Sequence, residues 1–177
     1  MTDTYPDDVA GPYGAPPREF VDRDGRRIEI RRSDGGTDEL VEMYVGFDPA
    51  DRAQGIPPLE EDRINEWLDT LVDADALNVV ARHEGAPIGH AMLVPDDDDN
   101  YELAIFVLAE YQNAGIGTEL IEGLLGAGRE AGVERVWLTV ERWNNAATAL
   151  YRKVGFTPTD GGGFELEMVA RIAGNPS

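Results

Sequence analysis

The chain has 177 residues, with 35 Asp or Glu against 15 Lys or Arg and a formal net charge of −20. This length suits one domain with a buried core, and the charge disfavours nucleic acid or an anionic membrane as a partner. The chain has no cysteine, which excludes a disulfide framework, a thiolate metal site and a cysteine nucleophile. No apolar run approaches the roughly 18 residues that cross a bilayer. Residues 1–8 also lack the pattern of a secretory signal, so we expect a cytoplasmic protein.

The acidity allows two interpretations. Lys153 is the only lysine, and excess carboxylate with few lysines is typical of proteins adapted to molar salt, where salt screens the repulsion between carboxylates. We favour this interpretation, a halophilic protein from a salt-adapted organism. The alternative is a surface that attracts cationic partners. The acidity therefore does not identify a substrate.

The first 25 residues carry four prolines, several glycines and aspartates, and little periodicity. Such a composition buries too little apolar surface to fold alone, so we expect a flexible, acidic and proline-rich tail over 1–25. A single domain should then span 26–172, with a short tail over 173–177. Its first strand is predicted at residues 27–31, where polar and apolar residues alternate.

Two helices and a hairpin are expected next. Apolar residues recur at helical spacing over 34–47 and again over 60–71, with a segment rich in proline and glycine between them. Strands at 78–82 and 88–94 are joined by a turn-forming segment that contains His83, which predicts a hairpin with His90 in its second strand. Four consecutive aspartates at 96–99 lack the spacing and the glycine of a calcium loop, so we expect a solvated loop.

From residue 101 the pattern becomes strand, glycine loop, helix, strand, helix, strand. Strands are predicted at 103–108 and 133–140, and an amphipathic helix follows Thr118. A short helix can be capped by Asn144 or Asn145 and ended by Gly155. In the last strand, over 164–170, apolar residues from Phe164 onward alternate with charged ones.

The most informative stretch is Gln112–Gly117, between the strand at 103–108 and the helix after Thr118. Glycines at positions 115 and 117 relieve steric restriction, so several backbone N–H groups can turn toward one point. The helix that follows adds its unpaired N–H donors and the positive end of its dipole. This combination predicts a site for a phosphate or pyrophosphate that needs no lysine.

The second half of the chain resembles the Gcn5-related N-acetyltransferase (GNAT) superfamily. Gln112-x-x-Gly115-x-Gly117 is similar to its pyrophosphate loop, and the segment from Asn144 to Phe156, which begins 27 residues after Gly117, is similar to its second motif. The resemblance covers about residues 101–170; the first half agrees in element order. It implies an α/β (α+β) fold with a twisted, mixed, mostly antiparallel sheet of six to seven strands. About four helices would flank the sheet, which would be splayed at an acetyl-CoA site.

By this resemblance, acetyl-CoA is the co-substrate. Free backbone groups on the edge of the strand at 105–107 would pair with the two pantetheine amides, as an added strand would. The glycine loop and the helix start would hold the pyrophosphate, and Asn144 would meet pantetheine or substrate unless it only caps its helix. The cofactor-binding residues so implied are Ile105, Phe106, Val107, Gln112, Asn113, Ala114, Gly115, Ile116, Gly117, Thr118 and Asn144.

The resemblance also implies catalytic residues. Tyr151 takes the position of a general acid for the departing thiolate, against the alternative of a core tyrosine. Glu102 takes the position of a glutamate that several branches of the family keep as general base. Other branches place the base where this chain has Thr139, which departs from their pattern and leaves Glu141 as the reserve candidate. With two histidines and no cysteine, a metal site is not expected.

The resulting hypothesis is an N-acetyltransferase that moves an acetyl group from acetyl-CoA to a primary amine by direct attack in a ternary complex. Three classes of amine are open: a protein lysine, a protein N-terminus and a small-molecule amine. Residues 44–77, which carry specificity in the family, faintly resemble bacterial protein-lysine acetyltransferases. The alternative is a non-catalytic acyl-CoA-binding regulatory domain, whereas a P-loop module fails because the Gly-Lys-Ser/Thr ending is absent. We expect a monomer or a homodimer.

Overall fold

A computed structural model describes residues 5–6, 9–11, 13–33, 38–46, 60–73, 76–159 and 163–173. The strands are β1 (Arg18–Val21), β2 (Arg27–Arg32), β3 (Leu77–His83), β4 (Ala86–Pro95), β5 (Tyr101–Val107), β6 (Arg135–Glu141), β7 (Thr157–Pro158) and β8 (Glu165–Arg171). The helices are α1 (Asp38–Val45), α2 (Glu61–Asp73), α3 (Ile116–Glu130) and α4 (Asn145–Lys153), with a 3-10 turn at Ala109–Tyr111. Among these residues no helix is long and apolar enough to cross a membrane.

The strands form one sheet in the order β1-β2-β3-β4-β5-β6-β8-β7. Within the described residues, neighbouring strands are antiparallel except β5 and β6, which are parallel. The expected mixed, mostly antiparallel sheet is confirmed, although it has eight strands rather than six to seven. The additional strands are β1 and the two-residue β7.

The two parallel strands pair only where they begin. Tyr101 lies opposite Val136 and Glu102 lies opposite Trp137, and no further pair follows along β5. On its other side β5 stays paired with β4 over its whole length. The sheet therefore forks after Glu102, and the rest of β5 presents one edge without a strand partner. This fork is the splay that the GNAT resemblance implied.

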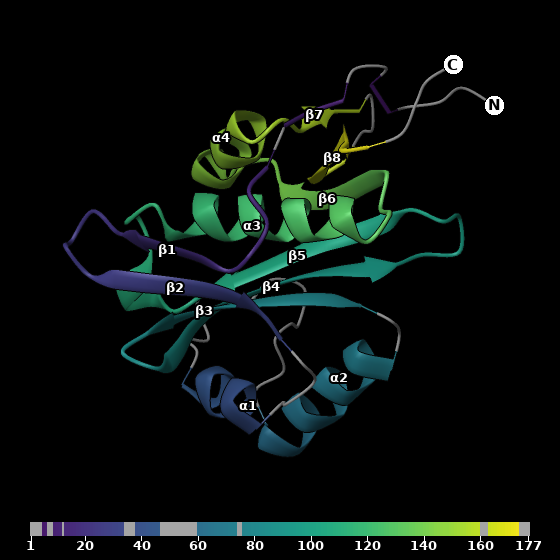
Figure 1. Ribbon diagram of the computed structural model, residues 1–177. Coiled ribbons are helices and arrows are strands. Elements are labelled where there is room, and N and C mark those ends of the chain that lie inside the picture. Colours follow the sequence, from purple (N-terminus) through teal and green to yellow (C-terminus); the bar gives the residue numbers. More distant parts are fainter. Residues whose placement is uncertain are drawn as a thin grey trace.

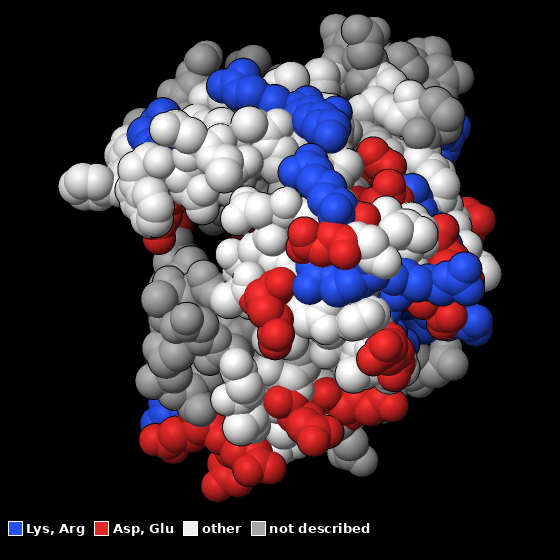
Figure 2. Space-filling view, turned by 90° about the vertical axis from the view of Figure 1, so that its left-hand side faces the viewer, with Lys and Arg blue, Asp and Glu red and all other residues white. Residues whose placement is uncertain are grey.

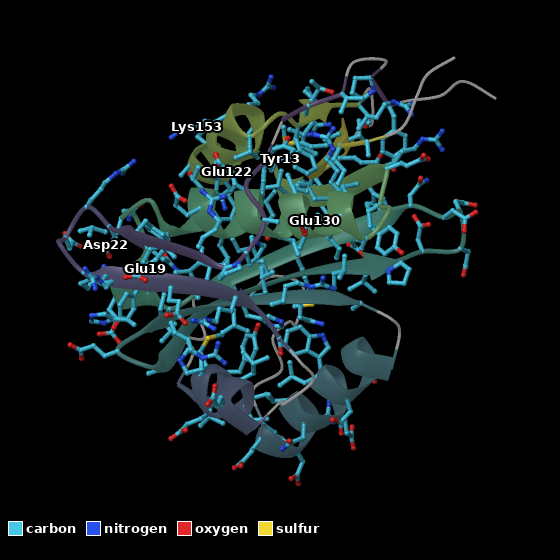
Figure 3. The ribbon with its side chains drawn as sticks, viewed as in Figure 1. Tyr13, Glu19, Asp22, Glu122, Glu130 and Lys153 are labelled. Carbon is cyan, nitrogen blue, oxygen red and sulfur yellow. The ribbon has the colours of Figure 1, made fainter. Side chains whose placement is uncertain are left out.

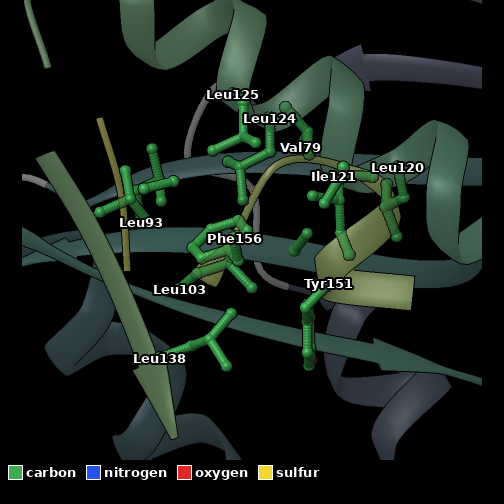
Figure 4. Packing of buried hydrophobic residues seen from close by; sticks show 14 of the residues in the cluster. Val79, Leu93, Leu103, Leu120, Ile121, Leu124, Leu125, Leu138, Tyr151 and Phe156 are labelled. Atoms are coloured by element: carbon green, nitrogen blue, oxygen red, sulfur yellow. The ribbon is translucent and has the colours of Figure 1, made fainter. Parts of the chain in front are cut away.

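The helices cover both faces of the sheet, α3 and α4 on one face and α1 and α2 on the other (Figure 1). The α3 helix packs against β2, β3, β4 and β5, and its buried side contributes to the larger core cluster. Figure 4 shows four labelled side chains of α3 in the same cluster as Phe156 and Leu103: Leu120, Ile121, Leu124 and Leu125. A second cluster lies between the sheet and α1 and α2, and includes Tyr44 and Leu68.

Local signals account for most of these elements. The hairpin of β3 and β4 turns at Glu84 and Gly85, whose φ angles of 52° and 83° suit a tight two-residue turn. The α4 helix begins where the Asn144 side chain accepts a hydrogen bond from the N–H of Ala147, and Gly155, with φ of 112°, follows its end. Of the two asparagines considered for the cap, Asn144 performs it.

The N-terminal segment is not a free tail. Its strand β1 pairs with β2, and the Tyr13 hydroxyl donates a hydrogen bond of 2.6 Å to the carbonyl of Val154 at the end of α4. Arg18 contacts Glu119 of α3 at 2.5 Å. Figure 3 shows Tyr13 lying along α3 beside α4. The expectation of a flexible tail up to residue 25 is therefore wrong for the described part of this segment.

Glycines on α3 explain how the segment comes so close. A Cβ atom at Gly126 would lie 2.7 Å from the backbone nitrogen of Ala15, and one at Gly123 would lie 3.5 Å from Arg18 Cδ. The segment has no core of its own and is stabilised by contacts with residues more than a hundred positions away, which no local pattern reveals. Two small residues three positions apart on a buried helix face were the available signal.

One further expectation about burial is wrong, and some segments are outside the described residues. Phe164, predicted on the apolar face of the last strand, precedes β8 and is 95% exposed. Its carbonyl accepts a hydrogen bond from the N–H of Arg142, but its ring has no core to enter. The predicted proline- and glycine-rich segment over 48–58 and the end of the predicted C-terminal tail, 174–177, fall outside the described residues.

Candidate functional site

The glycine loop, residues Gln112–Gly117, follows β5 at the open end of the fork and leads into α3. Asn113 and Gly115 have φ angles of 61° and 90°, a conformation that glycine, and less readily asparagine, adopts at low cost. Gly115 holds the N-cap position of α3, and no side chain caps the helix. The unpaired N–H groups of the first turn of α3 are therefore open to a ligand.

The polar groups of the glycine loop divide between its two sides. The Ala114 carbonyl accepts a hydrogen bond of 3.0 Å from the N–H of Arg23, and the Asn113 carbonyl accepts one of 3.4 Å from the Arg23 guanidinium. Across the described ranges, no protein acceptor bonds the N–H groups of residues 113–118. An anion fits this arrangement, because N–H donors and the helix dipole are aimed at one region.

The α4 helix lies against the start of α3. A Cβ atom at Gly117 would lie 3.4 Å from Leu150 Cδ2, so the glycine lets α4 approach closely. The Asn144 side chain is occupied by capping α4 through its oxygen, which leaves its amide nitrogen for another partner. The second motif is thus brought beside the first, as their family spacing implies.

The unpaired edge of β5 begins one residue beyond Glu102 and ends at Val107. Ile105 and Val107 are half-buried against the main core, whereas the Phe106 ring lies on the opposite face with Tyr44 and Trp67. The Gln112 side chain donates a hydrogen bond of 3.0 Å to the Val107 carbonyl. Gln112 thereby ties the glycine loop to the end of the edge strand.

Tyr151 projects from α4 into the main core. It is 9% exposed and its ring meets Phe156 edge-on, with 6.0 Å between ring centroids (Figure 4). Burial raises the pKa of its hydroxyl to about 12, because the charged phenolate is poorly solvated there. The hydroxyl is therefore protonated at neutral pH and can act as a donor. The same cluster includes Ile105 and Val107 of the β5 edge.

Glu102 stands at the last paired position before the fork. Burial and the negative charge of Asp96 raise the pKa of its carboxyl group. Asp96 is fixed by accepting hydrogen bonds from the Trp137 indole at 2.8 Å and from the N–H groups of Asp98 and Asn100. The raised pKa makes the Glu102 carboxylate a stronger proton acceptor than an ordinary glutamate.

The other candidates lie farther along β6 or away from the fork. Thr139 and Glu141 pair with residues of β8 rather than with β5. His83 contacts the Tyr111 hydroxyl, and His90 is buried beneath α1. Among the described residues no group of three or more His, Asp or Glu could hold a metal ion.

A hollow along α2, lined by Glu60, Asp62, Arg63, Glu66, Trp67 and Thr70, is on the other side of the sheet from α3.

The charge on the face around the β1–β2 turn is uneven. Figure 2 looks from the side where Figure 3 places Asp22 and Lys153. Lys and Arg side chains lie across its upper and middle part, Asp and Glu side chains lie among them in the middle, and Asp and Glu gather below, toward α1 and α2. The excess of basic side chains is therefore confined to the upper part of this face.

The family follows from a comparison with known proteins. The profile of the acetyltransferase (GNAT) family matches residues 37–156, a span from before α1 to the end of the second motif. The chain belongs to this family. The matched span includes both the glycine loop and α4.

Curated relatives match part of the chain. An uncharacterised N-acetyltransferase of Mycobacterium tuberculosis is 36% identical over 91 residues, 51% of this chain and 58% of the relative. The ribosomal protein bS18 alanine N-acetyltransferase of Haemophilus influenzae is 34% identical over 84 residues, 48% of this chain and 57% of the relative. The chain therefore matches little more than half the length of these relatives.

Solved structures share the fold over most of the chain. The GNAT domain of S. lividans PAT superposes with a TM-score of 0.74 at 17% identity, covering 87% of this chain and 96% of that one. The ribosomal-protein-alanine N-acetyltransferase of Brucella melitensis gives 0.66 at 23% identity, covering 80% and 98%. Salmonella typhimurium yncA, solved with acetyl-CoA, gives 0.65 at 20% identity, covering 82% and 94%. These likenesses confirm the GNAT fold.

Sequence reasoning missed the residues behind the glycine loop. Arg23 lies in the segment that was expected to be a tail and Arg26 directly follows that segment, yet both bond backbone carbonyls of the loop or of the turn before it. Asp22 is a carboxylate with only 7% exposure. The pattern Asp22-Arg-Asp-Gly25 was visible as a turn signal, but what it packs against could not be read from it.

Proposed function

We propose that the protein is an N-acetyltransferase that transfers an acetyl group from acetyl-CoA to a primary amine in a ternary complex. The observation that carries this proposal is the combination of a forked sheet with a glycine loop whose N–H groups find no acceptor among the described residues. Family membership supports it, since the matched span includes both features.

The described residues fit acetyl-CoA. The N–H groups of Asn113 to Thr118 suit the pyrophosphate, with Gln112 holding the loop to β5. The edge of β5 that faces the fork, around Ile105 and Val107, suits the pantetheine amides, which can pair with a strand edge. From the fork to the end of β5 is five residues, or roughly 17 Å at about 3.3 Å per residue, a span suited to an extended arm. When bound, acetyl-CoA supplies an activated acetyl thioester.

Two side chains would handle protons. Glu102, with its raised pKa, would accept a proton from the incoming ammonium so that the amine can attack. Tyr151 would donate a hydrogen bond to the sulfur as the C–S bond breaks. Burial raises the pKa of Tyr151 to about 12, so the phenol is protonated at neutral pH and can donate to the departing thiolate.

The amine is proposed only as a class. A protein lysine, a protein N-terminus and a small-molecule amine all remain candidates, and a relative whose name specifies ribosomal protein alanine supports testing a protein N-terminus first. The cytoplasmic location, the salt-adapted origin and the choice between monomer and homodimer remain predictions.

The proposal is tested with purified protein in molar potassium chloride. Calorimetry should detect acetyl-CoA binding, and release of free thiol should depend on an added amine. A panel of small amines, lysine peptides and peptides with an N-terminal alanine would identify the acceptor. Binding without thiol release across the panel would favour the regulatory acyl-CoA-binding alternative, and absence of binding would refute both.

A further inference from the structure

The turn between β1 and β2, residues Asp22–Arg26, lies against the back of the glycine loop. Two hydrogen bonds connect the turn to the loop, from Arg23 N–H to the Ala114 carbonyl and from the Arg23 guanidinium to the Asn113 carbonyl. A third, of 3.1 Å, runs from the Arg26 guanidinium to the Glu110 carbonyl just before the loop. In all three, the turn donates to a backbone carbonyl of the loop or of the residues that lead into it.

Because of the geometry of the peptide bond, these hydrogen bonds also determine which way the N–H groups of the loop point. In a trans peptide the C=O and the following N–H point in opposite directions. Because the Asn113 and Ala114 carbonyls point toward the turn, the N–H groups of Ala114 and Gly115 point away from it. These are among the donors that lack a protein acceptor within the described residues. The turn thus fixes which way the loop presents its donors.

The turn itself is rigidly built. Asp22 Oδ1 accepts hydrogen bonds from the N–H groups of Asp24 at 3.0 Å and Arg26 at 2.8 Å, and Oδ2 accepts one from Arg26 Nε at 2.7 Å. Burial alone would raise the pKa of Asp22, but these hydrogen bonds and the charge of Arg26 outweigh it and lower the pKa. The carboxylate is therefore ionised and holds Arg26 in place.

Arg26 links the turn to the residues ahead of the loop. Its guanidinium lies 4.2 Å from the centroid of the Tyr111 ring, a cation–π distance. The Tyr111 hydroxyl in turn contacts His83 Nδ1 at 2.7 Å. One side chain thus joins Asp22, the Glu110 carbonyl and Tyr111, so removing it should loosen the glycine loop as a unit.

We propose that Asp22 and Arg26 are positioning residues of the acetyl-CoA site, which hold the β1–β2 turn against the carbonyls of the glycine loop and so direct its N–H groups toward the pyrophosphate. This inference rests on the proposed function. It extends the site to the N-terminal segment, outside the span that matches the family profile. The group recognised is the pyrophosphate of the cofactor, not its pantetheine arm.

The test compares Arg26→Ala with Arg27→Ala, a matched control that also removes one positive charge. Arg27 is the neighbouring arginine, 78% exposed in its side chain and paired only with Glu19 among the described residues. Two ligands are titrated in matched salt, CoA and pantetheine, which lacks the pyrophosphate. We expect Arg26→Ala to weaken CoA at least fivefold and to leave pantetheine unchanged, while Arg27→Ala binds both as wild type does.

Three results would overturn the inference. Unchanged CoA affinity in folded Arg26→Ala would separate the turn from the site. An equal loss of affinity for CoA and for pantetheine in Arg26→Ala would show that the turn has only a general structural role. A loss of CoA affinity in Arg27→Ala equal to that in Arg26→Ala would show that the effect comes from net charge alone. Should Arg26→Ala not fold, Asp22→Asn carries the test, because it keeps an acceptor for the turn's N–H groups and removes the ion pair. Wild-type protein that fails to bind CoA would instead overturn the proposed function.

Discussion

Two polar regions on opposite faces of the sheet differ in how their hydrogen bonds are satisfied. On the α3 side, the N–H groups of residues 113–118 have no protein acceptor within the described part of the chain. On the α1 side, His90 is fully buried, yet Nδ1 contacts the Tyr44 hydroxyl at 2.6 Å and Nε2 contacts Asn78 Oδ1 at 2.7 Å. Both ring nitrogens of the histidine have partners.

This difference separates a binding site from a structural network. A buried polar group without a partner costs free energy, so a chain keeps such groups where a ligand or water completes them. A group such as His90, whose hydrogen bonds are all made within the protein, contributes to the fold and has no ring nitrogen left to bind a ligand. Substitutions in the glycine loop should therefore change ligand affinity more than stability, and changes in the His90 network should do the reverse.

The largest expected effect is on turnover, at Tyr151. If its hydroxyl stabilises the departing thiolate, Tyr151→Phe removes an interaction made chiefly in the transition state and should lower kcat by roughly 10²-fold or more. The Kd for acetyl-CoA should stay close to wild type, because the ring still packs against Phe156. Steady-state kinetics with an amine for which chemistry is rate-limiting makes the measurement. Wild-type turnover with that amine would show that Tyr151 is a structural residue of the core and not a catalytic one.

The next effect is on cofactor affinity, at the glycine loop. Gly115→Asp places bulk and negative charge beside the pyrophosphate and should raise the Kd for acetyl-CoA at least tenfold, about 1.4 kcal/mol. Gly132→Asp is the matched control, since Gly132 has φ of 93° against 90° at Gly115 and lies in open space. Both variants bear the same backbone strain, so calorimetry on the pair isolates the ligand contact. Equal Kd values would remove the loop from the site.

The opposite signature is expected of the His90 network. Burial lowers the pKa of His90 from 6.5 to about 3, so below pH 6.5 the unfolded chain binds a proton that the folded chain does not. The free energy of unfolding should then fall as pH drops from about 6 to 4, by up to about 1.4 kcal/mol per unit. Denaturant unfolding across this range measures the slope. His90→Asn should reduce it without changing acetyl-CoA affinity, and an unaltered slope would contradict the assignment.

A smaller effect is expected at Glu102, where substitution should change the pH dependence of the rate rather than the affinity for acetyl-CoA. As the base, it must be ionised, so the rate should fall as pH drops through its raised pKa. Glu102→Gln should flatten this acidic limb and regain rate at high pH, where free amine is abundant. A wild-type pH–rate profile in Glu102→Gln would move attention to Glu141 or to a water-mediated route.

The smallest and least local effect concerns salt. With a net charge of −20, carboxylate repulsion is least screened at low ionic strength, where the Debye length is about 30 Å at 0.01 M against about 3 Å at 1 M. The Tm should rise with potassium chloride from millimolar to molar concentrations. A Tm independent of salt would refute the halophilic interpretation and favour cationic partners as the reason for the acidity.

The sequence by itself determined the parts of the site whose geometry is local. Gly115 and Gly117 predict the loop from the sequence. Gly115 adopts a positive φ, and Gly117 allows α4 to approach closely, and glycine meets both requirements. Asn144 and Gly155 likewise mark the two ends of α4. The six expected strands also appear, and in β2 the burial of one face imposes the period of two that predicted the strand. Such signals require no knowledge of distant residues.

Only the tertiary structure decided what stands behind the loop. Arg23 and Asn113 are 90 positions apart, and β1 is stabilised by β2 and α3 rather than by its own composition. The exposure of Phe164 and the fork after Glu102 are also set by which strands pair and where pairing stops. These features depend on contacts between segments that fold onto one another, and composition or periodicity within either segment carries no record of its partner.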